Sequence, residues 1–408
     1  MSAVLLLVPA LAYSPTGVLK AQWESSGAFI GFSTDMYADM VNDAPRTKGF
    51  EQAIQRRLRC RAGECVVLDI GTGPFAILAL FAARAGARKV YAVEANAEAA
   101  EQARATVAAA VARGEIDPGT IEVISGFSTA ITLPEPADLL VAEISGSVAT
   151  EEGMCHSVRD ARLRHMARPN DPASYIPARC QTVVAPASYC LNHRCETDEA
   201  ALTENSWPMH DVEARAGPRL AGEPEYPYRC IQDVHQYVGV GPVRVQCTDP
   251  WLLALSAPQL WEDIVFGGDE LPPGPGRHSP PAPLVFRVTA AEIEANGRRF
   301  AAELELQGVG AELAAQAARG AARSLCGFAC WPRLVLDEGE GDEPPIIVQS
   351  RGMAGEPRES HWQTVLPLLG TPAVVKAGDE ISVQFTMELD VDIGVPPSYE
   401  ITATVNSM

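Results

Sequence analysis

Hydrophobic runs alternate with amphipathic stretches between residues 64 and 143. The stretches between the runs carry apolar residues at helical spacing, as in Phe75–Arg84. Four apolar runs have the length and side-chain types of buried strands: Cys65–Ile70, Lys89–Val93, Ile121–Ile124 and Ala137–Glu143. This alternation predicts a doubly wound α/β domain with a parallel sheet over residues 61–177, whose ligands bind at the carboxyl ends of the strands.

Residues 15–60 have the spacing of helices. Met36, Met40 and Val41 recur at helical intervals, and a second apolar stripe follows from residue 50 to 58. We therefore expect residues 1–60 to form a helical segment that caps the ligand site of the α/β domain. The apolar start of the chain lacks a basic region and is too short to span a bilayer, so we expect Val4–Leu11 to pack on the body. A secretory signal is the alternative for this start.

After Pro177 the pattern changes to short β-rich runs separated by glycine and proline clusters. This texture predicts an antiparallel β-barrel or sandwich over residues 178–408. Gly268–Pro283 is expected to be an exposed loop and Glu338–Pro345 an acidic turn, whereas residues 190–275 have weak periodicity. The predicted strands are Gln181–Ala185, Pro283–Val288, Phe300–Leu306, Phe328–Leu336, Ile346–Gln349, Glu380–Leu389 and Tyr399–Val405.

Composition narrows the class of partner. The 408 residues are 47% hydrophobic and 21% charged, as in globular proteins. A net charge of −20 argues against nucleic acid and anionic membranes, because phosphates bind basic surfaces. It would attract a cationic substrate, although acidity can also serve solubility alone. The ten cysteines do not have the spacing of zinc sites, so we expect no metal and reduced thiols in the cytoplasm.

The most specific local signal lies in residues 66–96. A buried strand runs into Asp69-Ile-Gly71-Thr-Gly73, a helix follows, and the next strand ends at Glu94. Glycine at positions 71 and 73 lets the main chain approach a ligand closely. An acid about 20 residues beyond such a turn can hydrogen-bond both hydroxyls of a ribose. The segment therefore predicts a site for a nucleoside cofactor.

Four further stretches, together with this turn, resemble the protein arginine methyltransferases. They are Tyr37–Arg46, the segment Glu143–Gly153 with its two glutamates, Pro177, and Ser360-His361-Trp362. Their order over residues 30–408 is that of the family. The Tyr-Ala-Asp-Met sequence, a Ser-Thr pair at 128–129 and the glycine after the second glutamate are closest to the monomethylating, type III branch. Known members of that branch often have two tandem modules, and this chain has the length for one.

The resemblance implies S-adenosylmethionine as the cofactor and S-adenosylhomocysteine as its product. Arg46 would pair with the carboxylate of the methionyl tail, Met40 would pack near the transferring methyl, and Ser128 would reach the adenine edge. Phe75 and Ala130 depart from the family pattern, which has a glycine and an acid there. Four residues would complete the cofactor site: Asp69, Gly71, Gly73 and Glu94.

The resemblance assigns the substrate guanidinium to Glu143 and Glu152. A guanidinium is a permanent, planar cation that two carboxylates can hold by paired, charge-assisted hydrogen bonds. Two close carboxylates raise one another's pKa unless a cation lies between them. Glu151-Glu152 alone would be interpreted as a solvated acidic loop. The position of Glu143 at the end of a strand, beside the glycine turn, favours the site.

His361 and Asp43 form a second expected pair. In the family, the loop histidine contacts an acid three residues after the methionine, which is Asp43 here. Such a pair can tie the β domain to the cofactor domain and relay a proton. The resemblance also places Trp362 along the aliphatic stem of the substrate arginine.

These implications predict an S-adenosylmethionine-dependent arginine guanidino N-methyltransferase that forms monomethylarginine on proteins. One alternative is the same chemistry on free L-arginine or another small guanidine. A second is a regulatory scaffold that binds cofactor without turnover. A third is a dehydrogenase with the same βαβ unit, which would need a different glycine spacing. The family also implies a homodimer with a dimerisation arm near 250–275, for which Trp251–Phe266 is an apolar candidate. The same stretch is equally suited to the barrel core.

Overall fold

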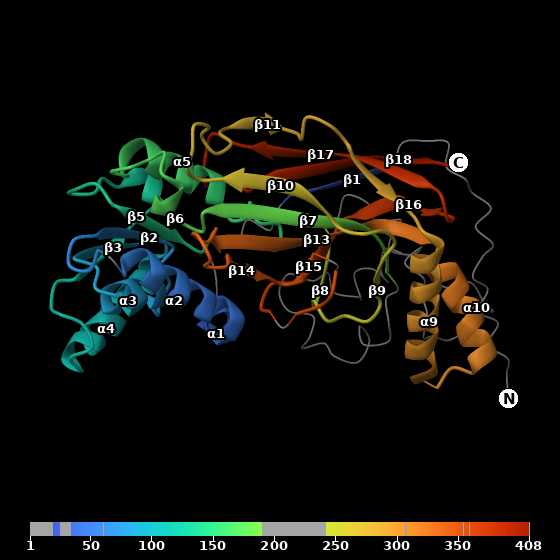
Figure 1. Cartoon of the computed structure of the whole chain (residues 1–408), viewed down its shortest axis with the longest axis horizontal. Helices are drawn as coiled ribbons and strands as arrows, with labels where there is room; N and C mark the ends of the chain where they lie inside the picture. Colours follow the sequence, from blue (N-terminus) through green and yellow to red (C-terminus); the bar gives the residue numbers. More distant parts are fainter. Residues whose placement is uncertain are drawn as a thin grey trace.

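The computed structural model describes residues 19–24, 34–59, 61–189, 242–306, 308–353, 355–358 and 360–407. The predictions for Val4–Leu11, for Cys60, Cys190 and Cys195, and for residues 190–241 lie outside these ranges, as does the N-terminal part of the resemblance. In Figure 1 the α/β domain lies at one end, the antiparallel strands fill the middle, and a helical hairpin lies at the other end.

The predicted α/β domain is present. Its five parallel strands have the order β4-β3-β2-β5-β6, and their bounds are Ile121–Ser125, Lys89–Glu94, Val66–Ile70, Leu139–Ala142 and Tyr175–Ile176. All five side chains of β2 are buried, and all but Asp69 are apolar, as expected for a strand covered on both faces of a parallel sheet. The helices of this domain are α3 (Ile77–Arg84), α4 (Ala97–Ala112) and α5 (Met154–Arg164).

The N-terminal segment is only partly helical. Helices α1 (Thr34–Asn42) and α2 (Ala44–Leu58) confirm the helical spacing. The prediction of helix from residue 15 was wrong for Leu19–Glu24, which forms strand β1 and pairs antiparallel with β18 (Ser398–Asn406). Residues 19, 21 and 23 are buried and residues 20 and 22 are exposed, which is the period of a strand with one face on a core.

Two antiparallel sheets form the second domain, as predicted. The larger sheet has the order β10-β7-β13-β15-β8, with β14 and β16 beside β13 and β9 beside β7. The smaller has the order β1-β18-β17-β11, with β12 beside β17. The remaining bounds are β7 Arg179–Tyr189, β8 Val243–Val245, β9 Leu252–Ala254, β10 Gln259–Val265, β11 Gly276–His278, β12 Leu284–Arg287, β13 Ser324–Asp337, β14 Ile346–Gln349, β15 Thr364–Leu366, β16 Leu368–Val374 and β17 Glu380–Leu389.

The two sheets share an aromatic core. Trp261 of β10 stacks on Phe385 of β17 with ring centroids 4.7 Å apart, and Trp23 of β1 stacks on Tyr399 of β18 at 5.1 Å. Phe328 of β13 joins them edge-on. Because these rings come from both sheets, one core closes the sheets into a barrel-like domain.

One predicted strand is a helix. Phe300–Leu306 belongs to α9 (Ala290–Leu306), which forms a hairpin with α10 (Ala311–Ala321). Phe300 and Leu304 are buried four residues apart on one helical face, and Phe300 packs edge-on against Trp251 at 5.1 Å. Glu338–Pro345 is a turn as predicted, whereas the predicted loop at 268–283 contains the short strand β11.

The apolar stretch Trp251–Phe266 forms β9 and β10, both paired with β7. Trp251, Trp261 and Phe266 are buried in cores of the chain. This arrangement matches the interpretation of the stretch as barrel core.

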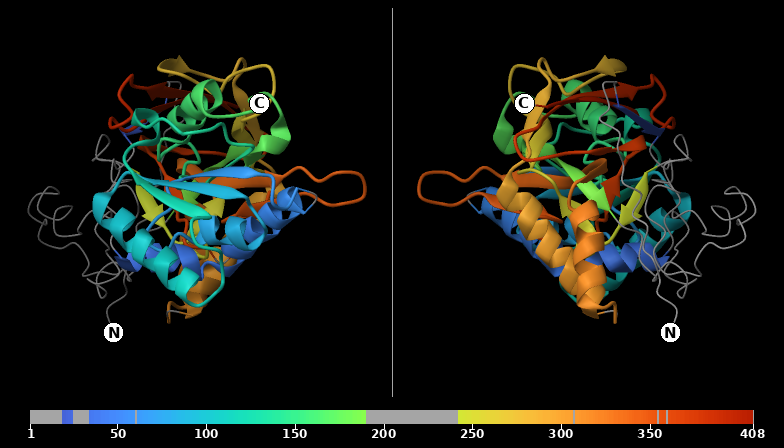
Figure 2. Two further views of the ribbon diagram at one scale, coloured as in Figure 1. Left: turned by 90° about the vertical axis from the view of Figure 1, so that its left-hand side faces the viewer. Right: turned by 90° about the vertical axis from the view of Figure 1, so that its right-hand side faces the viewer.

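Helix α2 is fastened to the barrel-like domain by charge pairs. Arg56 and Arg57 lie 3.1 Å and 3.0 Å from the carboxylate oxygens of Asp337 at the end of β13. Arg59 pairs with Glu343 in the acidic turn at 2.9 Å. Figure 2 shows the hairpin that joins β13 to β14 projecting beside this helix. Helix α2, which begins after Asp43 and carries Arg46, is therefore held to the barrel-like domain at its C-terminal end.

Candidate active site

A cavity opens at the carboxyl ends of the parallel strands, where the sequence predicts the ligand. Besides the predicted residues, Tyr37, Phe75, Phe127 and Ile393 contribute to its wall. Asp43, Asp69, His361 and Trp362 do not line it. The predicted site residues that line it are Met40, Arg46, Gly71, Gly73, Glu94, Ser128, Glu143 and Glu152.

The glycine turn forms the floor of this cavity. Gly71 and Gly73 have φ angles of +76° and +63°, which side chains rarely adopt. A Cβ at position 71 would lie 2.5 Å from the Ile144 side chain. The Glu94 carboxylate accepts hydrogen bonds from the amides of Gly73 and Asn96, both at 2.9 Å. The acid predicted for a ribose is therefore oriented by the turn itself.

Asp69 supports the turn from behind. It is fully buried and accepts a hydrogen bond of 2.6 Å from the Thr72 hydroxyl. Burial raises the pKa of Asp69 to about 7. The Asp69 side chain holds the glycine turn and does not line the cavity.

Arg46 and Glu143, which both line the cavity, form a buried ion pair. Arg46 Nε donates to Glu143 Oε2 at 2.8 Å, Nη2 contacts the same oxygen, and Nη1 donates to the Met40 carbonyl at 3.2 Å. From the sequence, we expected Arg46 to pair with the methionyl carboxylate of the cofactor and Glu143 to bind the substrate guanidinium. In the structure the guanidinium of one satisfies the carboxylate of the other, since both are nearly inaccessible to water.

Glu152 lies in the same cavity without this compensation. Burial raises the pKa of Glu152, and the nearby carboxylates of Glu143 and Glu151 raise it further, to about 8. Burial also raises the pKa of the Tyr37 hydroxyl, and the charges of Glu94 and Glu152 raise it further, to about 12. Several acids therefore act on one small volume, and a cation placed there would lower the pKa of Glu152 and favour its ionised form.

Neighbouring Glu151 has a different task. It forms a buried ion pair with Arg244 of β8 and accepts a hydrogen bond from the Val148 amide at 3.2 Å. The two adjacent glutamates are thus separated by environment, one paired within the barrel and one at the cavity.

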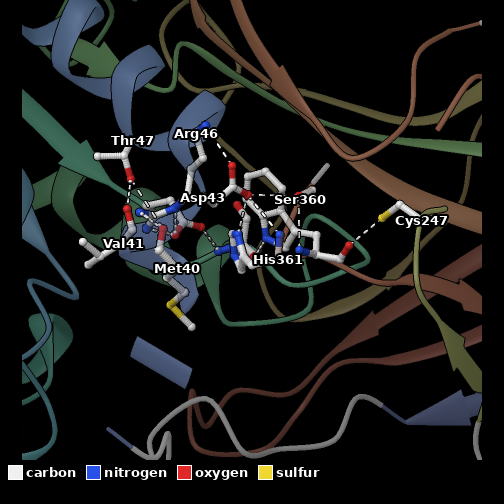
Figure 3. Close-up of polar contacts among 11 residues, drawn as sticks. Met40, Val41, Asp43, Arg46, Thr47, Cys247, Ser360 and His361 are labelled. Carbon is white, nitrogen blue, oxygen red and sulfur yellow. Dashed lines mark hydrogen bonds and ion pairs between the residues drawn. The ribbon is translucent and has the colours of Figure 1, made fainter. Parts of the chain in front are cut away.

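The predicted contact between His361 and Asp43 is present (Figure 3). Asp43 is the N-cap of α2 and accepts from the Arg46 amide at 3.1 Å. Its other oxygen accepts from His361 Nδ1 at 2.8 Å and from the Ser360 hydroxyl at 3.1 Å. Burial would raise the pKa of Asp43, but the hydrogen bonds from His361 and Arg46 lower it to about 2. One carboxylate therefore joins the cofactor-side helix to the β14–β15 loop.

Trp362 braces the acidic loop. Its indole Nε1 donates to the Ser145 carbonyl at 2.7 Å, and its ring centroid lies 4.5 Å from that of His361. The side chain is buried and lies outside the cavity wall. The structure therefore shows it supporting the loop between Glu143 and Glu152.

Sequence reasoning missed several residues around the site. Ile393 reaches the cavity from the β17–β18 loop, and Arg244 and Glu262 approach the acidic loop from the barrel. These residues are isolated in sequence, and no local motif marks them. Tyr37 was part of a quoted motif but received no role.

Comparison with known proteins agrees with this arrangement. The chain is 36% identical over 183 residues to protein arginine N-methyltransferase PRMT10 of Oryza sativa subsp. japonica, which is 45% of each chain. It is 34% identical over 152 residues to protein arginine N-methyltransferase 6 of Danio rerio, covering 37% of this chain and 40% of that protein. Over these segments, the chain is similar in sequence to protein arginine N-methyltransferases.

The fold is similar to that of solved structures over most of the chain. The crystal structure of Arabidopsis thaliana protein arginine methyltransferase 10 superposes with a TM-score of 0.60 at 20% identity, over 93% of this chain and 95% of that one. The Trypanosoma brucei PRMT1 enzyme–prozyme complex with AdoHcy gives 0.57 at 18% identity, over 88% and 89%. No protein-family model matches the chain. The match to the rice methyltransferase spans less than half of its length.

Proposed function

We propose that the protein is an S-adenosylmethionine-dependent methyltransferase that acts on the guanidino group of arginine. The observation that carries this proposal is the cavity itself, in which the glycine turn, Glu143, Glu152 and Arg46 meet. Because the pKa of Glu152 in this cavity is raised to about 8, a ligand with a fixed positive charge would best stabilise its ionised carboxylate. The Arg46 guanidinium on Glu143 supports the proposal, because it is a cation of the same chemistry held by this carboxylate.

The residues fit the proposed cofactor. The turn presents main chain without side chains, Glu94 presents a carboxylate for a ribose diol, and the Arg46 guanidinium suits the methionyl carboxylate. Ser128 lies in the wall on the β4 side, where the adenine is expected. S-adenosylmethionine would supply an electrophilic methyl on a sulfonium.

In the proposed mechanism the two acids orient the attacking nitrogen. Glu143, oriented by Arg46, and ionised Glu152 would hold the substrate guanidinium by charge-assisted hydrogen bonds. Positioning of this kind supplies much of the rate, because a bimolecular step becomes effectively unimolecular. One proton must leave the guanidinium after it gains a methyl. Glu152, or the pair His361–Asp43, would accept it.

We propose arginine in proteins as the substrate and monomethylarginine as the product. The relatives are methyltransferases of proteins by name, and the likeness to the type III motifs supports a single transfer. Assembly as a homodimer is part of the same proposal, and the Trypanosoma neighbour is itself a heterotetrameric complex. Buried free thiols in the described ranges, such as Cys65, Cys155 and Cys180, support a reducing, cytoplasmic setting.

Mass spectrometry of two parallel reactions tests the function. Both contain S-adenosylmethionine, one with an arginine- and glycine-rich peptide and one with free L-arginine. A gain of one methyl on the peptide supports the proposal, and methyl on the free amino acid alone would make this a small-molecule enzyme. Glu152→Gln should lower turnover by at least ~100-fold while cofactor binding is kept. Cofactor binding with no methyl on either substrate would support a regulatory scaffold.

A further inference from the structure

A buried carboxylate with no role in the proposed mechanism lies behind the acidic loop. Glu262 on β10 is 8% exposed. Its oxygens accept hydrogen bonds from the Thr150 hydroxyl at 3.0 and 3.2 Å and from the Thr182 hydroxyl of β7 at 2.6 Å. Thr150 belongs to the loop that carries Glu143 and Glu152, so the carboxylate contacts this loop directly.

The hydrogen bonds of this cluster have one consistent direction. A hydroxyl has a single proton, and Thr150 and Thr182 both donate theirs to Glu262. The oxygen atoms of both threonines can then accept hydrogen bonds from other donors. The Tyr399 hydroxyl lies 3.0 Å from the Thr150 oxygen, and the Ala149 amide donates to the Thr182 oxygen at 3.0 Å. An ionised carboxylate at position 262 satisfies every donor at once.

The Tyr399 hydroxyl is itself held in place. The ring of Tyr399 stacks on Trp23 at 5.1 Å and meets Trp261 edge-on at 5.5 Å. Strands β7, β10 and β18, from both antiparallel sheets, therefore converge on the consecutive loop residues Ala149 and Thr150.

Only one residue separates this anchor from the cavity. Glu151 follows Thr150 and is fixed by its ion pair with Arg244, and Glu152 comes next. With residues 149, 150 and 151 all tied to the barrel, the backbone of Glu152 has little freedom. Burying a carboxylate is unfavourable compared with an apolar side chain of equal size, so stability alone does not explain an acid at position 262.

We propose that Glu262 is a positioning residue that holds the acidic loop through Thr150 and Thr182, so that Glu152 faces the substrate. This inference rests on the proposed methyl transfer. It differs from a general structural role because it predicts a local effect on the loop and on the arginine substrate. The cofactor turn, which the cluster does not touch, should be unaffected.

The test is Glu262→Gln, which keeps the shape but turns one acceptor into a donor. A glutamine NH₂ facing either threonine leaves that hydroxyl without its acceptor. We expect kcat/KM for the arginine substrate to fall by about tenfold or more, while the Kd for S-adenosylmethionine changes less than about twofold. Deuterium exchange at the amides of residues 148–152 should become faster.

The matched control is Asp263→Asn, the next residue on β10, which contacts Arg179 and Gln181 at 2.8 and 2.9 Å on the outer face. It should leave kcat/KM and the exchange of the loop unchanged. Thr182→Ser should keep activity, whereas Thr182→Val should reproduce the loss. If Glu262→Gln does not fold, Thr150→Val, which keeps the side-chain shape, decides the question with the same readouts.

The outcomes separate this inference from the proposed function. Faster loop exchange in Glu262→Gln, with a wild type that methylates no arginine, would support the anchoring and reject the reaction. A wild type that methylates arginine, with Glu262→Gln unchanged in both kcat/KM and loop exchange, would overturn the inference. Equal loss of substrate and cofactor binding would overturn it as well, because the effect would then be global.

Discussion

At the scale of single residues, Glu152 is the group whose charge state would decide binding of the proposed substrate. Burial and two acidic neighbours raise its pKa to about 8, so much of the free protein carries a neutral Glu152 at pH 7. A bound guanidinium favours the ionised form and therefore lowers this pKa. Binding of substrate should then be coupled to release of a proton.

This coupling predicts a pH dependence with a definite sign. Affinity for an arginine substrate should increase as pH rises towards about 8, by at most roughly tenfold per pH unit, and level off above it. Isothermal titration of the cofactor-loaded protein between pH 6 and 9 measures it. Glu152→Gln, which cannot ionise, should bind weakly and without this slope. A wild-type profile that is flat over the range would contradict the assignment.

Asp43 makes a second residue-scale prediction. Its carboxylate caps α2 and also accepts hydrogen bonds from Ser360 and His361. Asp43→Ala should lower the free energy of unfolding by about 2 kcal/mol, since both a helix cap and partners from the loop are lost. Asp43→Asn retains a capping oxygen, so its effect should be smaller. Urea denaturation followed by tryptophan fluorescence compares the two, and equal effects would show that capping is not involved.

At the scale of elements, the glycine turn offers a matched comparison. Gly71 and Gly63 have nearly the same φ, +76° and +78°, but an added Cβ would meet Ile144 only at position 71. Gly63→Ala should therefore show backbone strain alone, about 1–2 kcal/mol of stability, with unchanged affinity for S-adenosylmethionine. Gly71→Ala should be less stable than Gly63→Ala and should bind the cofactor at least about tenfold more weakly than the wild type does. Equilibrium unfolding and cofactor titration of both variants provide the measurement.

If both alanine variants bind the cofactor as the wild type does, the turn is not its site. Loss of binding in Gly63→Ala as well would point to a general loss of structure.

Elements with a strong local pattern could be predicted from sequence. The strands β2, β3, β4 and β5 are rich in apolar residues and belong to one parallel sheet, and their predicted bounds agree with the structure to within a few residues. Strand β1 was missed because its period-two pattern is short and its partner β18 is distant in sequence. Phe300–Leu306 was misread because a short apolar run fits a strand or a buried helix equally well.

The site could be predicted where a motif marks it. The glycine turn follows from a motif with defined spacing, whereas the two glutamates and the Asp43–His361 contact follow from the resemblance to a known family. Arg244 and Glu262 have no such signal, because they reach the acidic loop only through long-range pairing of the barrel strands. The ion pair between Arg46 and Glu143 likewise depends on tertiary packing, because the two residues are 97 positions apart in the sequence.

At the scale of the whole molecule, charge bears on which substrate the protein selects. A net charge of −20 should steer cationic peptides towards the protein. We expect kcat/KM for an arginine-rich peptide to fall as salt rises from low to physiological ionic strength, because surface charges are then screened. A neutral peptide with one arginine, kept at the same concentration, is the control and should show a weaker dependence. Identical salt profiles for the two peptides would show that steering by the surface is absent.

The two domains meet where the chemistry is proposed. The α/β domain contributes the glycine turn and Glu94, the barrel anchors the loop that carries Glu152, and Asp43 joins them through His361. The central claim is that this junction transfers a methyl group to a guanidino nitrogen. Tandem mass spectrometry of the peptide product from S-adenosylmethionine with a labelled methyl tests it most directly. We expect one labelled methyl on a terminal guanidino nitrogen of arginine, absent with Glu152→Gln. Label on another side chain, or an equal yield from that variant, would contradict it.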